Sequence, residues 1–487
     1  MFGMTLLAIK VVSMSEKIPV KDVTPFNASE KYEGVAAKVN GKLYVRAING
    51  FFNKLRTFSL WGLMLAYFIT PWININGSQA VWFDLPSRQF HIWGLTFWPQ
   101  DFILLSWLLI ICAFGLFTIT TLAGRIWCGY TCPQTVWTFI FMWVEEKIEG
   151  NRNQRMKLDK APLTKSKFFK KVAKHSIWLI ISVATGIAFI GYFYPIRELV
   201  PDLVTFSIAD HWATFWLLFF TLATYGNAGW LREMVCTHMC PYARFQAVMF
   251  DQDTLIVSYD EGRGERGTGR GARKKGVDPV ESNIGDCVDC SMCVQVCPTG
   301  IDIRDGLQYQ CISCALCIDA CDEIMDKMEY PRGLIRYTNE HALKGNDVHI
   351  IRPKLVGYAT ALIVMVGIFI YSVFDRSPVE LDVSRDRGAL YTNSSDGRLQ
   401  NSYFAKIMNM SSQEHVFTIE VKGLPGAELS GKTKIHLMPG DVGSMPLNLK
   451  AVPWELKQSR TDIRFIATRD DGLVVEEESR FIGPAGR

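Results

Sequence analysis

Eight of the thirteen cysteines lie in one short stretch, between Cys287 and Cys321. They form the spacing C-x2-C-x2-C-x3-C twice, first as CVDCSMCVQVC and then as CISCALCIDAC. Bacterial ferredoxins use this spacing to hold iron–sulfur clusters, because three cysteines of a run bind one cluster and the fourth binds the other cluster. The stretch therefore predicts two [4Fe-4S] clusters.

Crossed ligation assigns to each cluster three cysteines from one run and one cysteine from the other run. The first set is Cys287, Cys290, Cys293 and Cys321, and the second set is Cys297, Cys311, Cys314 and Cys317. Pro298 follows the first run as the pattern expects, whereas Asp322 takes the place of the proline after the second run. Structural zinc is the main alternative, but zinc sites usually use two separated C-x2-C pairs. A disulfide framework is the other alternative, and it fails if this segment is cytoplasmic.

A second cysteine pattern, CxxxCP, occurs as CGYTCP and again as CTHMCP, 108 residues later. Its cysteines are Cys128, Cys132, Cys236 and Cys240. Cysteines at i and i+4 lie on one face of a helix, and the following proline indicates a helix break or a helix start. Thiolates are soft ligands that select Cu(I). A metal site, a redox dithiol and simple packing all stay open, and the duplication beside a ferredoxin stretch favours metal or redox chemistry.

Membrane helices are the elements that must position these cysteines. The chain is 49% hydrophobic, with 14 Trp and 30 Phe, which is rich for a soluble protein. Five apolar segments approach the roughly 20 residues that a helix needs to cross a bilayer. They are residues 58–75, 102–122, 177–194, 212–230 and 355–374. Buried core helices are the alternative, which the many Trp and Tyr residues near the ends of these segments disfavour.

The distribution of Lys and Arg predicts the orientation of these segments. Ten basic residues lie between Lys147 and Lys174, whereas the loops on the other side carry only Arg88 and Arg197. Cytoplasmic loops hold the excess of Lys and Arg in membrane proteins. We therefore expect the amino terminus and the ferredoxin stretch to be cytoplasmic and the residues after 374 to be periplasmic. Met14 is as good a translation start as Met1.

Each CxxxCP motif closes a hairpin of two apolar segments and precedes a short apolar stretch suited to the membrane interface. The membrane part is therefore predicted to contain two copies of one unit.

The predicted fold is an α-helical integral membrane protein of about five transmembrane helices, with an inserted α+β ferredoxin-like domain and an all-β immunoglobulin-like sandwich. The expected domains are a cytoplasmic arm (1–48), a four-helix membrane domain (49–258), a cytoplasmic linker and ferredoxin domain (259–345), a fifth transmembrane helix (346–376) and a periplasmic immunoglobulin-like domain (377–487).

The carboxy-terminal domain is predicted from short alternating runs that Gly, Pro, Asn and Asp interrupt, as in a small antiparallel sandwich. It has no cysteine, so we interpret it as a binding or assembly module. The Gly-rich and charged stretch 259–279 is predicted to be a mobile linker whose basic residues contact anionic lipid. A nucleic-acid partner is disfavoured, because the net charge is only +4 and this stretch lacks aromatic residues beyond Tyr259.

The order of these features closely resembles the CcoG/FixG family, accessory proteins for the assembly of cbb-type haem-copper oxidase. The shared features are the two CxxxCP pairs, the stretches LIVSYDEGRGE and YPRGLIRY, the double ferredoxin run and an immunoglobulin-like carboxy terminus. The resemblance implies an inner-membrane cupric reductase that reduces Cu(II) to Cu(I) for the oxidase. It implies that the four CxxxCP cysteines handle copper.

The chemistry is compatible with this role, because Cu(II) prefers nitrogen and oxygen ligands whereas Cu(I) prefers sulfur. Two alternatives stay open: a quinol-oxidising electron-transfer module similar to the NapH type, and a non-enzymatic assembly scaffold. The expected partners are membrane lipid, subunits of the cbb-type oxidase or copper chaperones, and an electron donor that the sequence does not name. No nucleic acid is expected.

Overall fold

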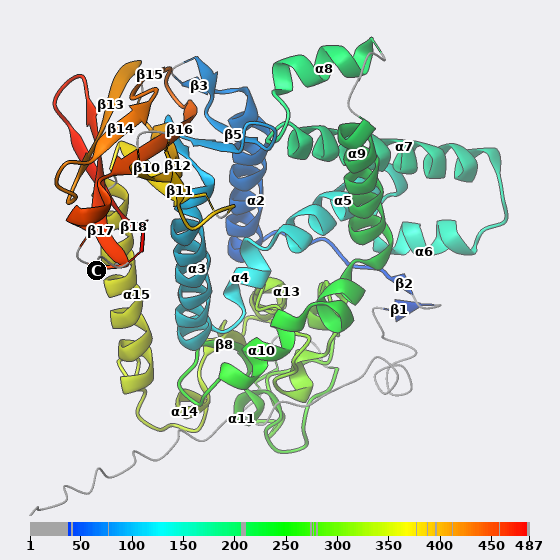
Figure 1. Ribbon diagram of the computed structural model, residues 1–487. Helices are drawn as coiled ribbons and strands as arrows, with labels where there is room; N and C mark the ends of the chain where they lie inside the picture. The colour runs from blue at the N-terminus through cyan, green and yellow to red at the C-terminus, as the bar shows by residue number, and fades with distance from the viewer. Residues whose placement is uncertain are drawn as a thin grey trace, which may run out of the picture. The chain divides into compact units, whose positions relative to one another are not determined.

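A computed structural model of the chain falls into two compact units, Met1–Phe369 and Ile370–Arg487 (Figure 1). The structure describes residues 38–39, 42–75, 77–205, 211–272, 275, 277–278, 281–375, 377–386, 388–394, 397–411, 413–456 and 458–484. Most of the arm expected over residues 1–48 lies outside the described residues. Its described part forms a small hairpin of β1 (Lys38–Val39) and β2 (Lys42–Leu43), followed by an extended segment.

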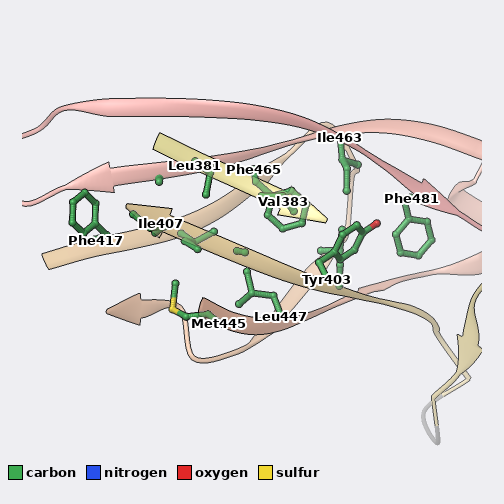
Figure 2. Close-up of a cluster of buried hydrophobic side chains, with 14 of the residues drawn as sticks. Leu381, Val383, Tyr403, Ile407, Phe417, Met445, Leu447, Ile463, Phe465 and Phe481 are labelled. Carbon is green, nitrogen blue, oxygen red and sulfur yellow. The ribbon is translucent and has the colours of Figure 1, made fainter. Parts of the chain in front are cut away.

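The second unit is the predicted antiparallel sandwich. One sheet has the order β10-β12-β16-β14 and the other has the order β15-β13-β17-β18. The strands are β10 (Val379–Arg385), β11 (Thr392–Asn393), β12 (Leu399–Asn409), β13 (His415–Lys422), β14 (Glu428–Gly431), β15 (Lys434–Leu437), β16 (Val442–Ala451), β17 (Arg460–Arg469) and β18 (Val474–Ile482). Alternate side chains along β12 and β16 are buried, as one face of a packed sheet requires. Tyr403, Phe417, Leu447, Phe465 and Phe481 fill the space between the sheets (Figure 2).

Five long helical segments of the first unit overlap the five apolar segments. They are α2 (Phe51–Ile69), α3 (Phe102–Ala123), α7 (Lys165–Ile190), α9 (His211–Thr224) and α15 (Pro353–Phe374). Three described helices, α3, α7 and α15, are long and apolar enough to cross a membrane, with hydropathies of 2.6, 1.6 and 2.1. The α9 helix has only 14 residues, but it continues directly into the π-helix η3 (Tyr225–Leu231). These apolar helices indicate a membrane protein, and the number of spans stays a prediction.

Two of these helices begin earlier than the apolar segments. The α2 helix includes Lys54 and Arg56, and the first three turns of α7 are rich in lysine. The predicted segments, which were chosen by hydropathy, did not include these polar turns. The turns are nevertheless helical, because lysine and arginine are good helix formers. The α2 helix also ends earlier than expected, because Pro71 cannot donate the backbone hydrogen bond that continuing the helix requires.

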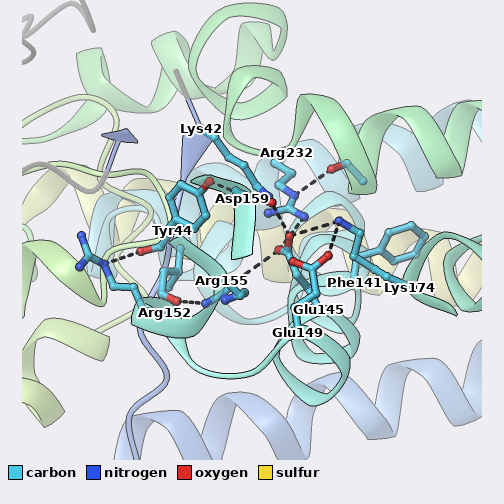
Figure 3. Close-up of polar contacts among 12 residues, drawn as sticks. Lys42, Tyr44, Phe141, Glu145, Glu149, Arg152, Arg155, Asp159, Lys174 and Arg232 are labelled. Atoms are coloured by element: carbon cyan, nitrogen blue, oxygen red, sulfur yellow. Dashed lines mark hydrogen bonds and ion pairs between the residues drawn. The ribbon is translucent and has the colours of Figure 1, made fainter. Parts of the chain in front are cut away.

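The basic loop that predicted the orientation is partly an internal charge network (Figure 3). It lies between α5 (Pro133–Glu149), α6 (Arg152–Lys160) and α7. The fully buried carboxylate of Glu145 pairs with Arg155 at 3.3 Å, Arg232 at 3.0 Å, Lys42 at 3.1 Å and Lys174 at 3.6 Å. Burial alone raises the pKa of Glu145, but Arg232 and the three other cations outweigh it and lower that pKa to about 2. Removing one member of such a buried network costs about 3–5 kcal/mol.

Two short strands close the ferredoxin segment. In sequence order they are β8 (Ile256–Tyr259) and β9 (Ile335–Thr338), and they pair antiparallel from Ile256 opposite Thr338 to Tyr259 opposite Ile335. The two stretches that flank the cysteine runs are therefore hydrogen-bonded to each other. Between them lie α11 (Glu261–Gly264), α12 (Met292–Gln295), η5 (Ile303–Asp305) and α13 (Leu316–Met328), and α14 (Glu340–Leu343) follows.

The stretch predicted as a mobile linker packs, in its first half, on the ferredoxin core. Arg263 pairs with Asp286 at 2.5 Å and donates to the carbonyl oxygens of Pro331 and Arg332. Asp260 accepts a hydrogen bond from Arg336 at 2.9 Å. The glycine and charge content suggested a solvated linker, but these charges are paired within the domain.

Candidate functional site

Each predicted set of four cysteines lines one cavity. Cys287, Cys290, Cys293 and Cys321 line one small cavity of about 20 Å³. Cys297, Cys311, Cys314 and Cys317 line a second small cavity, also of about 20 Å³. Cys293 also lines the second cavity, so the two cavities are neighbours. The structure thus brings together the sets that crossed ligation predicts.

The two cysteine runs share the same backbone shape. The residues on either side of the second cysteine adopt positive φ angles, 51° at Asp289 and 55° at Ser291 in the first run, and 51° at Ser313 and 61° at Ala315 in the second. A left-handed conformation is uncommon for residues other than glycine. Its repetition at four equivalent positions turns both runs around their cavities and leads directly into α12 and α13.

The cavities fit a four-iron cluster better than a zinc ion. Tetrahedral zinc with Zn–S bonds near 2.3 Å brings its sulfurs to about 3.8 Å from each other. Within the described part of the chain, no three cysteine sulfurs lie within 4.8 Å of one another. The corners of a larger cluster are further apart. Burial raises the pKa of Cys311 and of Cys321 to about 12, and metal binding is what deprotonates such thiols.

A buried arginine lies beside each cavity, and among the described residues only one of the two has a carboxylate partner. Arg304 lines the first cavity and pairs with Asp302 at 2.7 Å and with Asp289 at 2.5 Å. Arg56, on α2, is 1% exposed and stacks on Phe139 at 4.5 Å, and its Nε and Nη1 atoms have no hydrogen-bond partner among the described residues.

The ionisable groups that interact with Arg56 are two cysteines of the second set, Cys314 and Cys297, together with Tyr130. A buried cation without a counter-ion is costly. An anionic group within the second cavity, such as a cluster held by four thiolates, meets this need. When bound, such clusters supply one-electron transfer.

The CxxxCP motifs lie at helix breaks. Cys128 lies on α4 (Ile126–Tyr130) and Cys236 on the π-helix η4 (Val235–Met239). Cys132 and Cys240 are the residues that precede α5 and α10 (Pro241–Met249), each of which begins with the proline of its motif. The expectation that both cysteines of a pair share one helix face is therefore wrong, because the proline that follows Cys132 or Cys240 starts a new helix.

The two pairs lie near one another, because Cys128 of the first motif donates to Gln246 on α10, the helix that begins with the proline of the second motif. Cys236 interacts electrostatically with Cys132, Cys128 and Cys240, although it belongs to the other repeat from the first two. Burial raises the pKa of Cys236 to about 12. We call this group of Cys128, Cys132, Cys236 and Cys240 the four-thiol site. Cys112 lies exposed on α3 and is not part of it.

Two polar side chains contact the four-thiol site. Cys128 donates to Oε1 of Gln246 at 3.4 Å, and Arg125 donates from Nε to the same oxygen at 3.1 Å. In the second motif His238 is bound to Thr237 at 2.7 Å. The cation of Arg125 favours the charged form of the Cys128 thiol, although burial prevails and raises the pKa of Cys128.

The four-thiol site is in direct contact with the second cavity. A Cβ on Gly129 would lie 2.8 Å from the carbonyl oxygen of Ile312 and 3.0 Å from Cα of Cys314. Tyr130 donates to the carbonyl oxygen of Cys314 at 3.4 Å. Cys128, Ile312 and Cys314 belong to one buried cluster of side chains. The glycine of the first CxxxCP motif thus permits the close approach of the two sites.

Two features of this region were missed by sequence reasoning. The carboxylate of Asp319, on α13, accepts hydrogen bonds from the backbone N–H groups of Phe52 at 3.2 Å and Asn53 at 2.8 Å. It therefore caps the amino terminus of α2, and a side chain at Gly50 would collide with it. Arg56 is the second feature. Neither has a sequence signal, since both partners lie far away in the chain.

Three family models match the chain. A 4Fe-4S dicluster domain matches residues 231–340, and a 4Fe-4S binding domain matches residues 105–149. A model of the IG-like fold at the carboxy terminus of FixG matches residues 369–484.

Relatives match over most of the chain. The nitrogen fixation protein FixG of Rhizobium meliloti is 38% identical over 440 residues, which cover 81% of this chain and 83% of the relative. The chain belongs to the FixG family. Protein RdxB of Cereibacter sphaeroides is 39% identical over 421 residues, covering 83% of this chain and 86% of RdxB. The solved structure of a FixG-related protein from Vibrio parahaemolyticus is 34% identical and covers 22% of this chain and 99% of that one, with a TM-score of 0.21.

Membership of the FixG family confirms the resemblance found in the sequence. It identifies an iron–sulfur protein of the electron-transfer type with an immunoglobulin-like carboxy-terminal domain. The 4Fe-4S binding model at residues 105–149 covers the first CxxxCP motif, where the chain has only Cys112, Cys128 and Cys132.

Proposed function

We propose that this FixG-family protein passes electrons through two [4Fe-4S] clusters to the four-thiol site, where Cu(II) is the substrate and is reduced to Cu(I). The first cluster is held by Cys287, Cys290, Cys293 and Cys321, and the second by Cys297, Cys311, Cys314 and Cys317. The contact of Gly129 with Ile312 and Cys314 carries this proposal, because it joins the second cluster site to the four-thiol site without an intervening side chain.

The four-thiol site favours the product over the substrate. Each electron converts one Cu(II) into one Cu(I), and soft sulfur ligands bind Cu(I) more strongly than the harder Cu(II). Binding the product more strongly makes the reduction more favourable. Copper displaces the protons of the buried thiols, and the cation of Arg125 stabilises the resulting thiolates.

The biological role that we propose is the supply of Cu(I) for assembly of a cbb-type oxidase, with oxidase subunits or copper chaperones as partners. The ferredoxin domain lies in the cytoplasm in this proposal, the sandwich lies in the periplasm, and the chain crosses the inner membrane several times. The positive loops support this orientation.

An anaerobic titration of dithionite-reduced protein with Cu(II) tests the proposal. We expect the clusters to be reoxidised as a Cu(I)-specific chelator reports one Cu(I) for each electron lost. A Cys128→Ser and Cys236→Ser double variant should slow this step at least tenfold, and Cys112→Ser, on α3, is the matched control. Unchanged copper reduction in the double variant overturns the role of the four-thiol site.

A second candidate is an electron-transfer protein in which the four-thiol site holds a third cluster. The match of a 4Fe-4S binding model to residues 105–149 favours it. Among the described residues, no three cysteine sulfurs lie within 4.8 Å of one another, which is too far apart for one tetrahedral metal ion. Iron analysis separates the candidates: two clusters give about eight iron atoms per chain and three give about twelve. Twelve iron atoms, reduced to eight in the Cys128→Ser and Cys236→Ser variant, would exclude copper from this site.

A further inference from the structure

A large cavity of the first unit lies between α2 and α5 and has a volume of about 680 Å³. Asn53, Thr57 and Trp61 line it from α2, and Phe139, Trp143 and Glu146 line it from α5. The proposed copper chemistry does not use this cavity. Its volume lies in the range of small-molecule and cofactor sites.

One side chain separates this cavity from the second cysteine cavity. Leu316 lines both cavities, and its neighbour in the chain is Cys317. Pro298, which follows Cys297, also lines the larger cavity. A molecule bound between α2 and α5 would therefore lie next to two cysteines of the second cluster site, which is where an electron donor has to bind.

The lining suits a flat molecule with polar edges and an apolar tail. The carboxylate of Glu146 and the cations of Arg46 and Lys147 offer polar groups, while Phe139, Trp61 and Trp143 offer aromatic surface. The two tryptophans are 52% and 48% exposed. Leu65, further along α2, is 56% exposed and continues the apolar surface toward the other end of the helix. Amphipathic rings of this kind are typical of the membrane–water interface.

We propose that this cavity binds a membrane hydroquinone, an isoprenoid-type lipid with a two-electron aromatic head group, as the electron donor to the clusters. The inference rests on the proposed electron-transfer function and names its donor. A hydroquinone reaches the cavity from the bilayer along α2, so its head group enters between the aromatic side chains and its tail stays in lipid.

The electron and proton balance fits the site. Oxidation breaks two O–H bonds and gives a quinone, two electrons and two protons. Two [4Fe-4S] clusters accept one electron each, so one hydroquinone matches the capacity of the two cluster sites. The carboxylate of Glu146 lines the cavity and accepts a proton on its way to water. The acceptors are thus the clusters, and water takes up the protons.

Reduction of the clusters by a short-chain hydroquinone, without copper, tests the inference in the purified full-length protein. Cluster absorbance and electron paramagnetic resonance follow the reduction. Thr57→Trp fills the cavity without removing a hydrogen bond to another element, since Thr57 donates to Asn53 of its own helix. We expect it to slow reduction at least tenfold, whereas Leu63→Trp, at an exposed position of the same helix outside the cavity lining, should not.

A photoreactive quinone gives a readout that does not depend on electron transfer. It should label residues of α2 or α5 that line the cavity, and Thr57→Trp should abolish the labelling. Labelling elsewhere, equal rates in Thr57→Trp and Leu63→Trp, or reduction by a nicotinamide but not by hydroquinone would each overturn the inference. If dithionite drives copper reduction in the wild-type protein but hydroquinone does not reduce the clusters, only the donor is wrong. If neither reductant supports copper reduction, the proposed function fails.

Discussion

The two cysteine cavities have the same backbone turn but opposite electrostatic surroundings. Near the first cavity the charge of Arg304 is shared by two carboxylates, Asp302 and Asp289. Near the second cavity Arg56 is buried and has no carboxylate partner among the described residues. The duplicated sequence therefore supplies the same ligands twice, and the side chains around them make the two sites different.

This electrostatic difference predicts which of the two clusters has the higher reduction potential. A positive charge close to a cluster stabilises the reduced, more negative form and raises its reduction potential. We therefore expect the second cluster to have the higher potential. The cysteines that would hold it also lie nearest to the other two sites, because Gly129 of the first CxxxCP motif packs on the backbone of Cys314 and Leu316 lines both the second cavity and the large cavity. Cys287, Cys290, Cys293 and Cys321 would hold the cluster that supplies a place for the second electron of a two-electron donor.

The contact at Gly129 is where the largest effect is expected. Gly129→Ala places a methyl group 2.8 Å from the carbonyl oxygen of Ile312, so α4 must separate from the second cysteine run. We expect a loss of about 1–3 kcal/mol in stability and a large loss of electron transfer to copper. Thermal unfolding and stopped-flow reoxidation of the clusters measure both.

The matched control is Gly62→Ala on α2, where no atom lies within 4 Å of the added Cβ. Alanine is the better helix former, so this variant should be neutral or slightly more stable. If Gly129→Ala behaves like Gly62→Ala, the second cluster site and the four-thiol site do not depend on close packing.

Arg56 provides the most direct test of the electrostatic difference. Arg56→Leu removes the unpaired cation, and we expect the potential of the second cluster to fall by on the order of 50–100 mV, with the first cluster changing little. Redox titration followed by electron paramagnetic resonance resolves the two clusters. Lys54→Leu, on the exposed side of the same helix, is the control. Equal potentials in the wild-type protein would remove the basis of the comparison.

The first cavity should respond in the opposite direction. Asp302→Asn removes a carboxylate that neutralises Arg304, so the local charge becomes more positive and the potential of the first cluster should rise by tens of millivolts. The gap between the two clusters would then narrow. A fall in this potential in the same titration would show that Asp302 acts through the geometry of the loop, since it also accepts a hydrogen bond from Gln308 at its carbonyl oxygen.

Much of this structure could be predicted from the spacing of residues that are close together in the sequence. The cysteine spacing predicted which four sulfurs line each cavity, and the alternation in residues 377–487 predicted the sandwich, because both depend on neighbours in the chain. The proline after Cys132 and Cys240 indicated the helix breaks. Helix boundaries were less well predicted where lysine-rich turns extend α7 beyond its apolar part.

Contacts between distant segments could not be predicted. The meeting of the two CxxxCP pairs, the position of Arg56 and the pairing within residues 259–272 depend on how separate elements pack. Glycine gave a misleading signal in that stretch, since Arg263 and Asp260 are held by partners far along the chain. The cavity between α2 and α5 has no sequence pattern, because its lining comes from four separate segments.

Asp319 is expected to give the smallest effect, and it tests whether both cavities share one support. It lies on α13 between Cys317 of the second set and Cys321 of the first set, and its carboxylate caps α2. Asp319→Ala should cost about 1 kcal/mol, as the loss of a helix cap does, while Asp319→Asn should retain part of the cap. Thermal unfolding measures both variants, and Asp326→Ala, exposed on the same helix, is the control. If Asp319→Ala shifts the reduction potentials of both clusters, docking of α2 holds the two sites as one unit. If only the potential of the second cluster changes, the cause is movement of Arg56 alone.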